Sequence, residues 1–288
     1  MLNPDELRAL RRLSLQAGRK VDTLLGGRYR SAFKGQGLVF EEVRTYQRGD
    51  DVRHIDWKVT ARAQKPHIKR FREERQQTLV LAVDVSGSMF TGSGGADGRT
   101  DKALQLARLA GGLAYAATDS GDQVGLLRFS EQPLDYLPPR ASRAHAWAII
   151  RSLFDAEAPR DQGTDLSAAI QALTRRLKRR SLVVLVSDFL DPGPWQPALT
   201  ALAGRHGVHA LLLHDPVEVL PPALGLVELQ DAETGATQLV DLSKLRARRT
   251  VDARLSELRR CGVRAAAIST DQDPFQALRR HFESRGQR

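Results

Sequence analysis

From residue 78 onward, short apolar segments alternate with longer amphipathic segments. This alternation constrains the fold more than any other feature of the sequence. Apolar segments such as Leu182–Val186 have the length and the valine and leucine content of buried strands. The pattern predicts strands at 78–83, 123–129, 134–137, 182–186, 208–214 and 263–268, and helices at 100–119, 142–154, 165–177, 197–203, 245–260 and 274–282. Strands that alternate with helices form a parallel-type sheet covered on both faces, so we predict an α/β fold.

The N-terminal part of the chain follows a different pattern. A helix is predicted at 4–25, where leucines recur at helical spacing, and strands are predicted at 38–46 and 67–75. A turn at 49–51 lies between these two strands. We therefore expect two regions: residues 1–77 with a helix and a small β-rich segment, and residues 78–288 with an insertion at about 216–243 that contains a hairpin around 233–235.

Composition narrows the class of protein. The single cysteine, Cys261, excludes a disulfide framework and any multi-thiolate metal site, and its position after an apolar helix face predicts a buried thiol. No apolar run approaches the roughly 18 residues that a membrane-spanning helix needs. The N-terminus is polar and acidic, unlike a secretory signal. These observations predict a soluble, cytoplasmic protein without a membrane span.

The net charge of +10 is concentrated near the N-terminus. Residues 1–77 carry 18 Lys and Arg against 10 Asp and Glu, whereas residues 78–288 carry 26 against 24. Such a basic region binds an acidic protein, a nucleic acid or a membrane surface, or is only a solvated surface. Nucleic-acid binding is therefore the alternative function, although few aromatic residues accompany the basic ones and no zinc-finger or RNA-recognition signature is present.

Polar residues stand at the ends of three predicted elements. The sequence Asp84-Val85-Ser86-Gly87-Ser88 directly follows the first strand of the sheet, Thr164 precedes a helix, and Asp188 follows the strand at 182–186. Open α/β sheets bind ligands at the carboxyl ends of their strands. We therefore expect one site that is formed by Asp84, Ser86, Ser88, Thr164 and Asp188.

This candidate site offers two carboxylates and three hydroxyls, without histidine or cysteine. Oxygen ligands of this kind suit a hard divalent ion, so the predicted cofactor is Mg²⁺ or Mn²⁺. Hydroxyl ligands neutralise none of the charge of the ion, which leaves it able to accept a carboxylate from a partner protein. The alternative is that these residues only cap strand and helix ends, which is the role that we expect for Asp165.

The spacing of Asp84, Ser86 and Ser88 resembles the metal-ion-dependent adhesion site of a von Willebrand factor A domain. The threonine and the later aspartate of that site correspond to Thr164 and Asp188, so all five positions are filled. The resemblance covers about residues 78–288. It implies a doubly wound, mostly parallel sheet with helices on both faces and one antiparallel edge strand, and a role in protein interaction.

The preceding segment is similar to the DUF58 family. The similarity includes Gly49-Asp50-Asp51-Val52-Arg53, Ile55-Asp56-Trp57 and Thr60-Ala61-Arg62. DUF58 proteins join such a segment to a von Willebrand A-like domain and are associated with MoxR-type AAA+ ATPases, so the resemblance implies such an ATPase or its client as the protein partner. We expect one of two roles for the charged residues of this segment: a partner surface, or an ion-pair network that fastens the segment to the core. These residues are Asp50, Asp51, Arg53, Asp56 and Arg62. Trp57 is expected to be a packing anchor.

No enzyme signature accompanies the candidate site. Phosphatases that use a strand-end aspartate as nucleophile need a second carboxylate two residues later, where this chain has Ser86. No histidine lies near Ser86 or Ser88 in the sequence to activate a serine nucleophile, and the motifs G-x-S-x-G and G-x-x-x-x-G-K-[ST] are absent. We therefore predict a non-enzymatic adaptor, with a metal-dependent hydrolase as a third alternative.

Overall fold

The computed structural model describes residues 38–48, 50–73, 77–90, 101–154, 163–219, 225–230, 237–241 and 251–283. These residues belong to two compact units, one within 33–77 and the other continuing from residue 78. Four predicted features lie outside the described residues: the helix at 4–25, the loop at 91–98, the hairpin turn at 233–235 and the helix start at 245–250.

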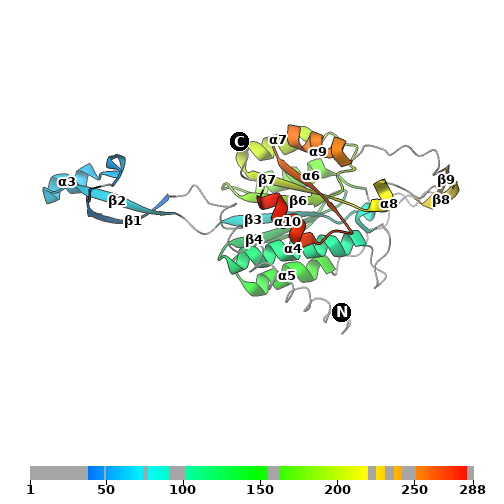
Figure 1. The fold of residues 1–288 in the computed structure, drawn as a ribbon, viewed down its shortest axis with the longest axis horizontal. Helices are drawn as coiled ribbons and strands as arrows, with labels where there is room; N and C mark the ends of the chain where they lie inside the picture. The colour runs from blue at the N-terminus through cyan, green and yellow to red at the C-terminus, as the bar shows by residue number, and fades with distance from the viewer. Residues whose placement is uncertain are drawn as a thin grey trace. The chain divides into compact units, whose positions relative to one another are not determined.

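The larger unit is built on a six-stranded sheet with the order β10-β7-β6-β3-β4-β5 (Figure 1). Its strands, in chain order, are β3 (Thr78–Asp84), β4 (Gln123–Phe129), β5 (Pro133–Arg140), β6 (Leu182–Ser187), β7 (Gly207–His214) and β10 (Arg264–Ser269). Neighbouring strands are parallel except β5, which pairs antiparallel with β4 at one edge. The sheet is therefore mostly parallel with one antiparallel edge strand, as predicted.

Helices cover both faces of this sheet (Figure 1). One face is covered by α4 (Asp101–Asp119), α5 (Arg143–Phe154) and α10 (Pro274–Glu283), and the other by α6 (Leu166–Arg176), α7 (Gln196–Arg205) and α9 (Val251–Arg260). Every residue of β3 after Thr78 is buried, as expected of a strand with helices on both sides. The doubly wound α/β fold is thus confirmed.

Local sequence explains where the helices begin. Asp165 caps α6, because its side chain accepts a hydrogen bond from the backbone N–H of Ala168 at 2.7 Å. Asp273 does the same for α10 through the N–H of Phe275 at 2.9 Å. The capping role predicted for Asp165 is therefore confirmed, and so is the burial of Cys261.

The region at 216–243 leaves the alternating pattern. A short helix, α8 (Pro216–Val219), directly follows β7, and β8 (Leu226–Gln230) pairs antiparallel with β9 (Thr237–Asp241). The sequence did not predict α8, which is a single turn beside the end of β7.

The smaller unit is a two-stranded antiparallel sheet of β1 (Leu38–Thr45) and β2 (His67–Glu73). Between them lie a 3₁₀ turn, η1 (Val52–His54), and α3 (Trp57–Ala63). Only a turn was predicted there. The helix forms because the Asp56 side chain accepts hydrogen bonds from the first free N–H groups, a capping signal that was readable in the sequence.

Among the described residues of both units, none of the helices combines the length and the apolarity needed to cross a membrane.

Candidate functional site

The candidate site lies where the order of the sheet changes direction. The chain continues from β3 to β4 on one side, and later returns to place β6 on the other side of β3. The carboxyl ends of β3 and β6 are therefore neighbours, and Asp84 and Asp188 stand at these ends. In open α/β sheets this switch point is where ligands bind.

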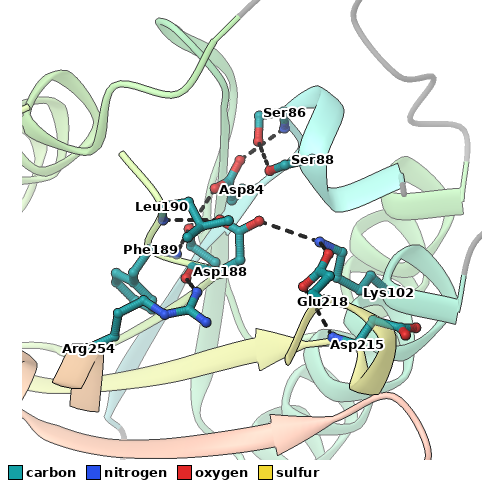
Figure 2. A network of polar contacts seen from close by, with 11 residues as sticks. Asp84, Ser86, Ser88, Lys102, Asp188, Phe189, Leu190, Asp215, Glu218 and Arg254 are labelled. Carbon is teal, nitrogen blue, oxygen red and sulfur yellow. Dashed lines mark hydrogen bonds and ion pairs between the residues drawn. The ribbon is translucent and has the colours of Figure 1, made fainter. Parts of the chain in front are cut away.

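Asp84 is completely buried, and both of its carboxylate oxygens accept hydrogen bonds (Figure 2). The backbone N–H of Ser86 donates to Oδ1 at 2.9 Å, and the hydroxyl of Ser187 donates to Oδ2 at 2.6 Å. Burial, followed by the negative charge of Asp188, raises the pKa of Asp84 from 3.8 to about 7. Without a cation, this edge thus carries more negative charge than its surroundings stabilise.

The two serines of the motif lie together beside Asp84. A tight 3₁₀ turn, η2 (Gly87–Phe90), follows β3 and brings the Oγ atoms of Ser86 and Ser88 to 3.2 Å from each other (Figure 2). The turn is closed by a backbone hydrogen bond from Met89 to the carbonyl of Ser86 at 3.1 Å. The turn therefore places two hydroxyl oxygens next to a buried carboxylate.

Asp188 is also buried and is held by the loop that follows β6. Its Oδ1 accepts a hydrogen bond from the N–H of Leu190 at 3.2 Å, and its backbone carbonyl accepts one from Nη1 of Arg254 at 2.5 Å. Phe189 adopts a left-handed backbone conformation with φ of 53°, which is unfavourable for a phenylalanine. Its buried ring packs near Trp195 and helps to fix this loop.

Thr164 is brought to the same edge by the backbone around it. The N–H of Asp165 donates to the carbonyl of Ser130, which follows β4, at 2.9 Å. The N–H of Leu166 donates to Asp191, in the loop after β6, at 2.8 Å. The start of α6 is therefore fixed between the ends of β4 and β6. The structure thus brings Asp84, Ser86, Ser88 and Asp188 into one group and anchors Thr164 at the same edge.

Sequence reasoning missed a buried lysine at this site. Lys102, in the first turn of α4, has no exposed surface. Its Nζ lies 3.5 Å from Oδ2 of Asp188 and makes a short hydrogen bond to Oε1 of Glu218 on α8 (Figure 2). No motif marks Lys102 in the sequence, and a lysine in the first turn of an amphipathic helix is not by itself a signal of burial.

Four of the five charged residues predicted on the smaller unit take part in local ion pairs. Asp50 pairs with Arg44 at 2.7 Å, and Asp51 pairs with Arg53 at 2.8 Å. Asp56 caps α3, and its carboxylate lies 3.4 Å from the ammonium of Lys69; Arg62 is exposed on α3. The Arg53 guanidinium lowers the pKa of Asp51 to about 2.

Each of these pairs joins residues within the smaller unit, and Arg44, Arg53 and Lys69 are each matched by a carboxylate. The two interpretations of the segment, a partner surface or an ion-pair network that fastens it to the core, both stay predictions. The nucleic-acid alternative also stays a prediction, because residues 1–37 of the basic region lie outside the described residues.

The packing role predicted for Trp57 is wrong. Trp57 is 71% exposed. It opens a helix of only seven residues, and none of the residues of that helix is fully buried. A short helix on a two-stranded sheet offers too little covered surface to enclose an indole.

The donor set fits a hard divalent cation. Asp84 and Asp188 supply carboxylate oxygens, and Ser86, Ser88 and Thr164 supply hydroxyls, while the raised pKa of Asp84 marks negative charge that a cation would stabilise. Among the described residues, there is no group of three or more His, Cys, Asp or Glu side chains that could hold a metal ion. A site here would therefore depend on its hydroxyls as well as on its two carboxylates.

Sequence comparisons place the chain among known proteins. The family model described as "Protein of unknown function DUF58" matches residues 42–260. Uncharacterized proteins of Mycobacterium bovis and Mycobacterium tuberculosis are each 33% identical over 292 residues, which covers 98% of this chain and 90% of the relative. An uncharacterized protein of Mycobacterium avium is 36% identical over 158 residues, or 52% of this chain and 93% of that protein.

Solved structures show the fold. The conserved hypothetical protein BatB from Bacteroides thetaiotaomicron matches with a TM-score of 0.50 and 15% identity, over 72% of this chain and 97% of that chain. The VWA domain of SpRpn10 matches with a TM-score of 0.42 and 10% identity, over 70% and 93%. At these identities the similarity concerns the fold alone.

Proposed function

This chain belongs to the DUF58 family and has a von Willebrand A-like fold, and from this premise we propose that it is a non-enzymatic adaptor that binds a divalent cation and a carboxylate of a protein partner. The observation that carries the proposal is the pair of buried carboxylates, Asp84 and Asp188, beside the hydroxyls of Ser86 and Ser88.

The residues of the site would have different roles in binding the cation and the partner. Asp84, Ser86, Ser88, Thr164 and Asp188 would hold Mg²⁺ or Mn²⁺, directly or through water. A bound ion would supply a Lewis-acidic position for an acidic side chain from outside. Leu190, 51% exposed and hydrogen-bonded to Asp188, offers apolar surface next to that position. An acidic side chain with an apolar neighbour is therefore the partner feature that the site would recognise.

An adaptor role is favoured over a hydrolytic one by the position of Asp84. A nucleophilic aspartate must reach its substrate, whereas Asp84 has no exposed surface and both of its oxygens accept hydrogen bonds. Ser86, two residues later, supplies no carboxyl group for general acid catalysis. We therefore propose that the protein binds its partner without changing it chemically. The family resemblance names a MoxR-type AAA+ ATPase, or a client of that ATPase, as the partner to test first.

A capture experiment tests this proposal. Wild type, Asp84→Asn and the exposed-site control Asp252→Asn are used as baits in native lysate, each with Mg²⁺ and with EDTA, after circular dichroism shows that all three are folded. We expect an AAA+ ATPase to be captured by wild type and Asp252→Asn with Mg²⁺ only. Capture that is indifferent to the metal and to Asp84 would contradict the metal-bridged mechanism.

A further inference from the structure

Lys102 is an unusual residue for a cation-binding edge. A lysine without exposed surface is costly to bury unless its charge is paired. Its Nζ has two carboxylate neighbours, Asp188 of the candidate site and Glu218 of α8 (Figure 2). A positive charge that belongs to the protein itself therefore already faces one of the carboxylates that a divalent cation would use.

The two contacts of Lys102 are unequal. The ammonium makes a short hydrogen bond to Glu218 but lies 3.5 Å from Oδ2 of Asp188, at the limit of a hydrogen bond. Glu218 is in turn fixed in place, because its Oε2 accepts a hydrogen bond from the N–H of Asp215 at 3.3 Å. The Oδ2 of Asp215 accepts one from the hydroxyl of Thr270 at 3.0 Å. Glu218 is thus a positioned second partner for the lysine.

We infer that Lys102 is the charge that a divalent cation displaces from Asp188, and that Glu218 is the carboxylate that retains the ammonium when this happens. This inference rests on the proposed cation binding at the same site. It assigns to Lys102 and Glu218 a role in setting the affinity of the site, without direct contact between either residue and the cation.

The physical reason is electrostatic. In a buried environment a second positive charge close to Asp188 is repelled by the ammonium of Lys102. The repulsion is relieved when the ammonium moves fully onto Glu218, which already makes the shorter contact. Glu218 would therefore favour cation binding through Lys102. Cation binding would also strengthen the ion pair between Lys102 on α4 and Glu218 on α8, and so hold these two helices together more firmly.

The experiment is a double-mutant cycle read by calorimetric titration of Mg²⁺ and of Mn²⁺ into the full chain. The variants are Lys102→Met, Glu218→Gln and the double variant. The charge-matched controls are Lys178→Met, in the exposed segment after α6, and Asp119→Asn, at the exposed end of α4. We expect Lys102→Met to bind at least about tenfold more tightly and Glu218→Gln at least about tenfold more weakly than wild type. In the Lys102→Met background, Glu218→Gln should change the affinity by less than about threefold, because the lysine through which Glu218 acts is gone.

The outcomes separate this inference from the proposed function. If wild type binds and Glu218→Gln costs the same affinity with and without Lys102, displacement is overturned while cation binding stands. If wild type does not bind but Lys102→Met does, the competition is supported and the proposed cation binding by the native protein fails. If no variant binds either metal, both fail. Should Lys102→Met not fold, Lys102→Gln takes its place in the cycle, and Glu218→Gln, on a partly exposed side chain, tests the wild-type background independently.

Discussion

Asp84 and Asp188 place two negative charges at the buried ends of neighbouring strands, and the protein supplies only part of the stabilisation that they need. Asp84 receives two hydrogen bonds, and Asp188 receives one from Leu190 and faces Lys102. The raised pKa of Asp84 shows that these contacts do not fully offset burial. The proposed binding function would explain why the chain keeps a buried carboxylate that lowers its folding stability.

Removal of the Asp84 charge should stabilise the metal-free protein. The pKa of Asp84 is about 7 in the folded chain and near 3.8 in the unfolded chain, so the folded state holds more protons between these values and loses stability as the pH rises through them. Asp84→Asn should therefore unfold at higher urea concentration than wild type at pH 8 in EDTA, and the difference should shrink towards pH 4. A stability difference that does not depend on pH would contradict this account.

A buried histidine pair should make the stability of the protein depend on pH in the opposite direction. Nδ1 of His209 and Nε2 of His281 lie 2.7 Å apart, and burial, with the charge of Arg264, lowers the pKa of His281 to about 4. The unfolded chain then holds more protons than the folded one between pH 6.5 and 4, so stability falls as the pH drops through this range, by up to about 3 kcal/mol. His281→Leu should reduce the loss of unfolding free energy between pH 6.5 and 4 in denaturant titrations, whatever the effect of the substitution on stability at pH 8. An unchanged loss would show that His281 is not its cause.

Among the elements, the alternating strands and helices of the larger unit were predictable because each packs an apolar face or segment into the core, and the central strands β3 and β6 are buried almost throughout. All the predicted strands of this unit are present, and β5 extends beyond the predicted 134–137 to Pro133–Arg140. The short helices α3 and α8 were missed because seven and four residues give no usable periodicity. Lys102 and Glu218 could not be linked from the sequence, since the contact between residues 102 and 218 depends on how α4 and α8 meet in the fold.

Packing between α4 and α10 leads to a prediction about these helices. A Cβ added at Gly112 would lie 2.7 Å from Cε1 of Phe275, whereas a Cβ at Gly204 in α7 meets no atom within 4 Å. Alanine in a helix is about 1 kcal/mol more favourable than glycine when there is space for it. Gly204→Ala should therefore raise the free energy of unfolding, and Gly112→Ala should lower it by about 1–3 kcal/mol because α10 must shift. Urea denaturation of both variants tests this, and stabilisation by Gly112→Ala would contradict the packing.

At the scale of the whole molecule, the described chain separates into a sheet-based unit with the candidate site and a smaller unit with its own ion pairs. The resemblance to a metal-ion-dependent adhesion site singled out Asp84, Ser86, Ser88 and Asp188 in the sequence. The structure brings them together because strand ends in a parallel sheet share one edge. The spacing of these residues could not show the buried lysine that faces Asp188. The contact between Lys102 and Asp188 is therefore a feature of the structure that the motif does not encode.

Cation binding should stabilise the whole chain. A ligand that binds only the folded state raises the free energy of unfolding by about 2.7 kcal/mol at a concentration of 100 times its Kd. Thermal unfolding of wild type should therefore shift upward with Mg²⁺ in a concentration-dependent way, and that of Asp84→Asn should not. An equal shift in both proteins would place the stabilising ion elsewhere.

Binding of Mn²⁺ can be followed by the loss of the electron paramagnetic resonance signal of the free ion, and it tests whether Asp84 and Asp188 hold a cation. We expect one bound Mn²⁺ per wild-type chain that excess Mg²⁺ displaces, and loss of this binding in folded Asp84→Asn and Asp188→Asn. Wild type that leaves the free signal unchanged, or variants that still bind one Mn²⁺, would contradict the assignment of Asp84 and Asp188 as the cation site.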